Sequence, residues 1–215
     1  MSSTSFSFLN HDIFEDINNG EIDPWISSDY HLFKELRKDL IDEQQRKLRQ
    51  KDTLEVFELH NSKVKPNDVI LFLGDLTEEE YGEDEYASVR NIIKSRSKLL
   101  NGKKYILKGN NDKFDDKFYK DCGFIRVYNE DYIETDEFLF SHIPVKVPKD
   151  MTKLNIHGHI HGSRSYWGVD CKNKIDVYWR LWNGPIKLSQ LVKEFENYTK
   201  EVKTEKGLWP CFIEY

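Results

Sequence analysis

An uninterrupted apolar run, VILFL at residues 69–73, constrains the fold of this chain more than any other feature of its sequence. The run has the length of a strand and is typical of a strand that is buried on both faces. It ends in Gly74-Asp75, which places a carboxylate directly after the strand. The sequence therefore predicts a covered sheet with a polar side chain at the end of its buried strand.

The order of the other predicted elements indicates a mixed α/β architecture. In the first half strands alternate with helices, which favours parallel pairing. The strands predicted there are residues 24–28, 69–73 and 105–107, and the helices are residues 32–51, 53–61 and 83–100. In the second half consecutive strands favour antiparallel pairing. A helix at residues 115–121 precedes strands at 124–128, 132–134, 138–141, 154–156 and 175–181, and a helix at 188–202 closes the chain.

Chain length and net charge limit the number of domains and the classes of partner. The 215 residues suit one domain, residues 1–215, in which residues 1–22 and 201–215 resemble no segment of known role. The net charge of -6, from 32 basic and 38 acidic residues, offers no basic excess for duplex nucleic acid. We therefore expect a small-molecule substrate rather than long nucleic acid.

Cysteine usage and the N-terminus bear on the compartment. Cys122, Cys171 and Cys211 are widely spaced and odd in number, so they indicate neither a disulfide framework nor a paired metal motif. The N-terminus lacks a secretory signal, and no run approaches the ~20 apolar residues that span a bilayer. We expect a soluble, cytoplasmic protein without a membrane partner.

Polar residues follow the predicted strands, in the order Asp29-x-His31, Gly74-Asp75, Gly109-Asn110, His142 and Gly158-His159-x-His161. Taken singly, an aspartate after a strand usually forms a turn or caps a helix. Taken together, the residues could converge, because the ligand crevice of an open α/β sheet lies beyond the carboxyl ends of its strands. Oxygen and imidazole donors without a thiolate suit Mn, Fe, Zn or Ni rather than Ca.

In this order, the blocks resemble the signature of the calcineurin-like metallophosphoesterases, which runs DxH, GDxx, GNHD or a GN-x-D variant, H, and GHxH. The match extends over residues 29–186, and the stretches FLGDL, LNGKKYILKGNND, SHIPV and NIHGHIHG are similar to a small bacterial and phage-encoded branch. The resemblance implies an α/β fold: a four-layer α/β/β/α sandwich of two mixed sheets flanked by helices. It also implies a dinuclear metal site at the strand ends.

The resemblance assigns a role to each ligand position. It implies that the first ion is bound by Asp29, His31 and His161, the second by Asn110, His142 and His159, and both by Asp75. Two divalent transition-metal ions are therefore expected, with Mn as the first choice and Fe, Zn or Ni as alternatives. Such a pair, ~3.5–4 Å apart, lowers the pKa of bound water and neutralises phosphoryl charge. The expected activity is phosphoester hydrolysis by a metal-bound hydroxide.

Asn111 departs from the family pattern, because many members have histidine at the third position of the GNHD block. There the histidine is thought to orient the phosphate and to protonate the leaving oxygen. Asparagine donates hydrogen bonds but supplies no proton near neutral pH, and a missing general acid typically costs ~10²–10⁴-fold. Some phosphodiesterase branches of the family also lack this histidine, which favours small diesters such as nucleotides. In the alternative interpretation, Asn111 maintains the turn and Asp112 caps the following helix.

The predicted catalytic group consists of Asn110, Asn111, Asp112 and His142, and the predicted substrate contacts are Asn111, Tyr166 and Trp167. Tyr30 is another aromatic at a predicted strand end, and a ring there could stack on a nucleobase or pack the sheets. Strand alternation favours a structural role for His157 over support of the site. His11 and His60 lie outside every block and are expected at the surface.

Two other functions remain open beside the phosphodiesterase. The first is a nuclease acting on single-stranded DNA or RNA, since relatives with this fold cut nucleic acids; the acidic charge disfavours it. The second is a non-catalytic metal-binding scaffold, as in the retromer subunit with this fold. The presence of all seven ligand positions argues against a scaffold.

Overall fold

The computed structural model describes residues 12–36, 42–77, 86–145, 152–162 and 173–202. The predicted substrate contacts Tyr166 and Trp167, and also His11, lie outside these residues. Among the described residues, none of the helices has the length and apolar character needed to cross a membrane.

The first sheet contains the buried strand and has the order β4-β3-β2-β1-β9. Its strands are β1 (Trp25–Ser27), β2 (Val69–Leu73), β3 (Lys103–Leu107), β4 (Phe124–Tyr128) and β9 (Ile186–Lys187). Strands β1 to β4 pair in parallel, and β9 pairs antiparallel with β1. The predicted parallel pairing of the first half is confirmed, whereas β9 was not predicted.

The second sheet has the order β5-β6-β7-β8. Its strands are β5 (Tyr132–Glu134), β6 (Phe138–Ser141), β7 (Leu154–His157) and β8 (Lys174–Asp176). Only β5 and β6 pair antiparallel, while β6 with β7 and β7 with β8 pair in parallel. The prediction of antiparallel pairing is wrong for these two pairs. Residues 142–153 and 158–173 are long enough for the crossovers that parallel strands require.

The helices are α1 (Ile13–Asn18), α2 (Glu43–Lys63), α3 (Tyr86–Ser97), α4 (Asp116–Asp121) and α5 (Leu188–Val202), with a 3₁₀ turn η1 at Lys34–Leu36. The helices predicted at residues 32–51 and 53–61 are wrong as separate elements, because one helix, α2, contains the end of the first and all of the second. Neither glycine nor proline interrupts it, and Asp42 caps its start by accepting a hydrogen bond from the Gln45 N–H. Helix α1 was not predicted.

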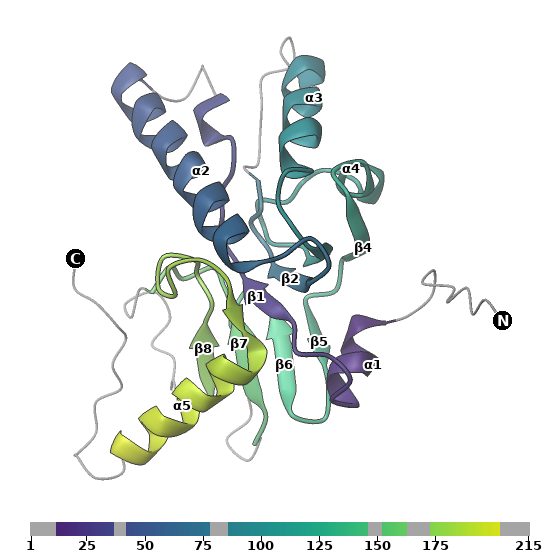
Figure 1. Cartoon of the computed structure of the whole chain (residues 1–215), viewed down its shortest axis with the longest axis vertical. Coiled ribbons are helices and arrows are strands. Elements are labelled where there is room, and N and C mark those ends of the chain that lie inside the picture. Colours follow the sequence, from purple (N-terminus) through teal and green to yellow (C-terminus); the bar gives the residue numbers. More distant parts are fainter. Residues whose placement is uncertain (1–11, 37–41, 78–85, 146–151, 163–172, 203–215) are drawn as a thin grey trace, which may run out of the picture.

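Strand β2 separates two hydrophobic clusters, as its uniform apolar sequence predicts. Ile70 and Phe72 face a cluster formed with α2, α3 and α4, whereas Leu71 and Leu73 face the second sheet. Figure 1 shows α2, α3 and α4 on one side of β1 and β2, and strands β5 to β8 on the other. Helices α1 and α5 contribute to the cluster between the sheets. The predicted fold class, two mixed sheets flanked by helices, is confirmed.

His60 corrects the expectation of a surface histidine, since it is fully buried on the inner face of α2. Thr53 and Val56, the other buried residues of α2, lie on the same face at helical spacing. Both ring nitrogens of His60 have hydrogen-bond partners, the Tyr30 hydroxyl and the Asn101 carbonyl. A buried histidine with satisfied nitrogens is compatible with the core, and the sequence pattern did not show these distant partners.

Candidate metal centre

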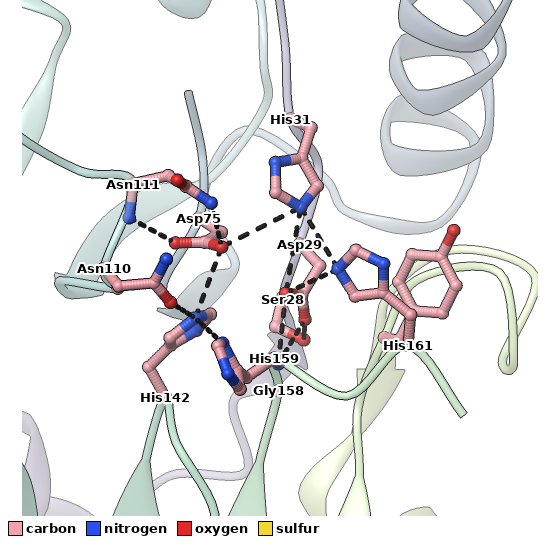
Figure 2. A network of polar contacts seen from close by, with 12 residues as sticks. Ser28, Asp29, His31, Asp75, Asn110, Asn111, His142, Gly158, His159 and His161 are labelled. Carbon is pink, nitrogen blue, oxygen red and sulfur yellow. Dashed lines mark hydrogen bonds and ion pairs between the residues drawn. The ribbon is translucent and has the colours of Figure 1, made fainter. Parts of the chain in front are cut away.

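The polar residues predicted at the strand ends meet at one edge of the two sheets (Figure 2). Asp29 and His31 follow β1, Asp75 follows β2, Asn110 follows β3, His142 follows β6, and His159 and His161 follow β7. The two sheets are joined at this edge by a parallel bridge between Ser28 and Tyr178. Parallel pairing within each sheet brings the carboxyl ends of these strands together, which is why residues up to 132 positions apart come into contact.

Five of these residues have a left-handed backbone, which side chains rarely adopt. The φ angles are 57° at Asp29, 46° at His31, 51° at Asp75, 73° at His159 and 50° at His161. Each such residue costs about 1–2 kcal/mol relative to an ordinary conformation, and such strain concentrates at functional sites. The loop after β1 is held in place by the loop after β2, because the N–H groups of Asp29 and His31 donate to the carbonyls of Gly74 and Asp75.

The first group of donor atoms consists of Asp29, His31 and His161, each with one ligand atom within 4.8 Å of the others. His161 Nε2 lies 3.1 Å from Asp29 Oδ1 and 3.1 Å from His31 Nε2. The carboxylate of Asp29 also accepts hydrogen bonds from the Ser28 hydroxyl and the His159 N–H. These contacts fix the direction in which Asp29 faces the two imidazoles.

The second group consists of Asp75, His142 and His159, again with ligand atoms within 4.8 Å of one another. His142 Nε2 lies 3.3 Å from Asp75 Oδ2 and 3.3 Å from His159 Nδ1. The amide oxygen of Asn110 lies 3.1 Å from the same nitrogen of His142. Asn110 therefore adds an oxygen donor to this group.

Asp75 lies between the two groups. Its Oδ2 atom is 3.3 Å from His142 Nε2 in the second group and 3.8 Å from His31 Nε2 in the first. The structure thus brings all seven predicted ligands together, and it groups them as the family resemblance implies. That they bind metal stays a prediction.

The spacing and chemistry of the donors fit a pair of divalent cations. Two ligand atoms about 2.1 Å from one cation lie about 3.0–3.4 Å apart, and the closest contacts within each group are 3.1–3.3 Å. His142 Nδ1 lies 2.9 Å from the Leu73 carbonyl oxygen and donates to it. In the neutral ring, Nε2 then presents its lone pair to the centre, as the outer hydrogen bond of a ligating histidine usually ensures.

The electrostatics of the centre favour a positive charge between the two carboxylates. Burial alone would raise the pKa of Asp75, but the hydrogen bond and charge of His142 lower it to about 2. Burial would likewise raise the pKa of Asp29, and His161 and His142 lower it. Conversely, although burial opposes the charged ring, Asp75 raises the pKa of His142 to about 9. Without metal, protonated His142 supplies the positive charge that a cation would bring.

Three glycines allow the ligand loops to approach one another. A Cβ atom at Gly74 would lie 2.5 Å from His142 Nδ1, and one at Gly158 would lie 2.5 Å from Asp29 Oδ2. A Cβ at Gly109 would overlap Asp75 Oδ1. Each of these glycines directly precedes a ligand in the sequence. They recur in the motif because there is no room for a larger residue beside the carboxylates and His142.

Asn111 contacts the carboxylate that the two groups share. Its backbone N–H donates to Asp75 Oδ1 at 2.9 Å, and its side-chain amide donates to Asp75 Oδ2 at 2.7 Å. This bidentate contact orients Asp75, as Figure 2 shows. The predicted contact of Asn111 with substrate stays a prediction.

In the structure Asp112 connects the loops of the centre, and the catalytic role predicted for it stays a prediction. The side chain is buried, and its oxygens accept hydrogen bonds from the N–H groups of Leu76, Thr77 and Gly109 and from the Tyr119 hydroxyl. These contacts join the loops after β2 and β3. The alternative prediction, that Asp112 caps the next helix, is wrong, because Asp115 caps α4 through the Phe118 N–H.

Two residues beside the centre, Tyr178 and Ser28, were not predicted from the sequence. The ring of Tyr178 stacks on the imidazole of His161, with centroids 4.6 Å apart and planes 16° from parallel. Its sequence position did not indicate this contact, because the sequence predicted a strand over residues 175–181. In the structure the strand β8 ends at Asp176, and Tyr178 lies beyond it. Ser28, by contrast, adjoins Asp29 and could have been proposed as its hydrogen-bond donor. His157 is buried at the end of β7 and donates to the Gly158 carbonyl, which supports the structural role predicted for it.

Comparison with known proteins identifies the family and one curated relative. A sequence model for calcineurin-like phosphoesterases matches residues 23–206. The uncharacterized protein MJ1445 of Methanocaldococcus jannaschii is 30% identical over 156 residues, which cover 69% of this chain and 77% of that protein.

Two solved structures are also similar to this chain. The protein of unknown function AQ665 from Aquifex aeolicus has a TM-score of 0.52 and 24% identity, over 80% of this chain and 98% of that one. This likeness concerns the fold alone. The Pseudomonas putida nuclease MPE has a TM-score of 0.35 and 19% identity, over 63% of this chain and 60% of that one.

Proposed function

The chain belongs to the calcineurin-like phosphoesterase family, and we propose that it hydrolyses phosphate diesters, with a nucleotide or another small diester as substrate. Membership of the family makes it a metal-dependent phosphoesterase, and the two donor groups provide candidate ligands for two ions. The preference for diesters is the part of the proposal that goes beyond the family.

The observation that carries the proposal is the double hydrogen bond from Asn111 to Asp75. Many members of the family that this chain resembles have a histidine at this position, which is thought to protonate the leaving oxygen. The amide of Asn111 supplies no proton near neutral pH, and its N–H groups are directed to the shared carboxylate. The chain therefore suits esters whose leaving group needs little protonation, and some phosphodiesterase branches of the family that it resembles lack the histidine as well.

The side chains of the centre would hold and orient the reactants. When bound, two divalent cations lower the pKa of water and neutralise charge on the phosphoryl oxygens. The chain contributes only two anionic ligands, Asp29 and Asp75, with neutral Asn110 and the imidazoles. The centre therefore remains positive and attracts a phosphate group. Asp75, oriented by Asn111, would set the separation of the two groups of donors.

A substrate comparison tests the proposal. Protein reconstituted with Mn²⁺ should hydrolyse bis-p-nitrophenyl phosphate with a higher kcat/KM than p-nitrophenyl phosphate. The reverse order would contradict the preference for diesters while leaving the phosphoesterase intact. Cyclic nucleotides and single-stranded oligonucleotides extend the comparison, and faster cleavage of the oligonucleotides would favour a nuclease.

The Asn111→His variant tests the role of the missing acid. We expect its gain in kcat/KM to grow with the pKa of the leaving group, reaching about 10²-fold for the most basic one, because only basic leaving groups need a proton in the transition state. The parent protein, assayed on the same series of aryl and alkyl diesters, is the control. An equal gain across the series would rule out this account of Asn111.

A further inference from the structure

Tyr30 separates two residues of the first donor group, Asp29 and His31, and its own side chain enters the hydrophobic core. The ring is 4% exposed and belongs to the cluster between the first sheet and helices α2, α3 and α4. It lies nearly perpendicular to the rings of Phe72 and His60, at centroid distances of 5.2 and 5.9 Å. The sequence left two roles open for Tyr30, stacking on a nucleobase or packing in the core. Its buried position favours packing in the core.

The Tyr30 hydroxyl lies 3.0 Å from His60 Nδ1. The other ring nitrogen of His60, Nε2, lies 2.9 Å from the Asn101 carbonyl oxygen, which can only accept. Nε2 therefore carries the proton, and Nδ1 accepts the hydrogen bond from Tyr30. Burial lowers the pKa of His60 to about 4, so the ring is neutral and this arrangement persists near neutral pH.

His60 is held on a rigid support. The imidazole stacks on Phe72 of β2, with planes only 4° from parallel. One residue later, Asn61 donates to the Leu99 carbonyl and accepts from the Asn101 N–H. Asn101 in turn donates to the Val64 carbonyl just past the end of α2. The last turn of α2 is thus bound to the turn before β3, and His60 extends this network to the loop after β1.

That loop needs support, because Asp29, His31 and Phe33 all have a left-handed backbone. Such conformations persist only where the surroundings impose them. Backbone hydrogen bonds from Asp29 and His31 hold one side of the loop. On the other side, Tyr30 is anchored in the core by its hydroxyl and its ring. Rotation of this side chain would turn the backbone of both flanking residues.

We infer that the Tyr30–His60 hydrogen bond positions Asp29 and His31, so that their side chains meet at one cation. Tyr30 and His60 are positioning residues, since neither belongs to the donor groups. The inference rests on the metal centre of the proposed function. It concerns ion binding rather than the choice of substrate.

Calorimetric titration of the metal-free protein with Mn²⁺ tests the inference without any assay of activity. Tyr30→Phe retains the ring and loses only the hydroxyl. We expect the Kd of one ion to rise about 10-fold, the lower end of the range for residues that support metal ligands. The matched control is Tyr128→Phe. Tyr128 is also 4% exposed, and its hydroxyl donates to Asp12, which belongs to neither donor group. The control should bind both Mn²⁺ ions with the affinities of the parent protein.

Two substitutions of His60 separate positioning from packing. Asparagine places its amide near the former Nδ1 and can still accept the hydrogen bond from Tyr30. Glutamine places its amide near the former Nε2, so it can donate to the Asn101 carbonyl but cannot serve Tyr30. Because glutamine fills more of the site, packing alone would make it the milder change. We expect His60→Asn to bind Mn²⁺ more tightly than His60→Gln, although His60→Gln has the higher Tm.

The outcomes distinguish this inference from the proposed function. Two bound ions in the parent, with the same affinities in Tyr30→Phe, would overturn the positioning role and leave the metal centre intact. Tighter binding by His60→Gln than by His60→Asn would do the same. A parent protein that binds no Mn²⁺ would overturn the metal centre and, with it, the inference.

Discussion

At the scale of single residues, the centre depends on side chains that hold its loops and its shared carboxylate in place. Asp112 joins the loop after β2 to the loop after β3 through four hydrogen bonds, and Asn111 fixes the shared carboxylate of Asp75. Each group that meets Asp112 is a donor, so a carboxylate suits the position and an amide does not. All four residues of the GNND segment, 109–112, therefore serve the geometry of the centre, and of these only Asn110 is a candidate metal ligand.

The Asp112→Asn variant tests this assignment. In asparagine an NH₂ group replaces one of the two accepting oxygens, so that two hydrogen-bond donors face each other. This costs about 1–3 kcal/mol of unfolding free energy. Mn²⁺ affinity should fall with it, because the two loops lose their connection. Urea unfolding and Mn²⁺ titration measure the two effects. Asp115→Asn is the control: asparagine caps a helix about as well as aspartate, so both quantities should stay near those of the parent. Equal effects of the two variants would refute the role of Asp112.

At the scale of elements, short loops after parallel strands carry the donors, and glycines let these loops meet. The first ligand after each of β1, β2 and β7 has a left-handed backbone, so the side chain turns toward the centre as soon as the strand ends. Gly158 brings the loop after β7 against Asp29, while Gly109 brings the loop after β3 against Asp75. Loop geometry, rather than the sheet itself, therefore sets the distances between donors.

The Gly158→Ala variant tests the close contact. The added methyl group would lie 2.5 Å from Asp29 Oδ2, so the carboxylate must move. We expect Mn²⁺ affinity to fall by about 10–100-fold, the range for disturbed support of metal ligands, while circular dichroism shows a retained fold.

Gly20→Ala is the control for Gly158→Ala. No atom lies within 4 Å of a Cβ at Gly20, but its φ of 68° is unfavourable for alanine. The control should lose about 1–2 kcal/mol of stability and keep its Mn²⁺ affinity. Unchanged ion binding by Gly158→Ala would show that the loop has room to adjust.

At the scale of the whole molecule, charge links folding to the ions. The metal-free protein holds a proton on His142, whose pKa is raised from 6.5 to about 9. Asp75 and Asp29 keep their negative charge, because the pKa of each is lowered. Metal binding must displace the proton of His142. Proton and metal ion therefore compete for the same nitrogen, and pH should act in opposite directions on the stability of the metal-free protein and on its affinity for metal.

The pH dependence follows from the sign of the His142 shift. Since the folded pKa of about 9 lies above the unfolded value of 6.5, the stability contributed by His142 is complete below pH 6.5 and is lost as pH rises through about 9. The Tm of the metal-free protein should therefore decline between these values. Over the same range, the apparent Mn²⁺ affinity should rise by up to about 10-fold per pH unit for the proton that His142 releases.

Calorimetry in buffers of different ionisation enthalpy measures the released proton, and thermal unfolding measures the Tm. In His142→Gln, most of the decline in Tm between pH 6.5 and 9 should disappear. An unchanged decline in this variant would show that another group is responsible.

The sequence by itself determined most of the strands and the identity of the candidate donors. Apolar runs such as residues 69–73 fix strands by local burial, and the predicted bounds of β2, β4, β5 and β6 are those observed. The order of the motifs identified the family and pointed to seven candidate donors, because each of them follows a strand in the chain.

Only the tertiary structure decided the direction of pairing in the second sheet, the burial of His60 and the partners of Asn111 and Asp112. The physical reason is that periodicity reports which residues are apolar together, whereas these features depend on partners distant in the chain. Asn111 meets Asp75 across 36 positions, and Tyr30 meets His60 across 30. Such contacts exist only once parallel strands and left-handed loops have brought separate segments to one edge.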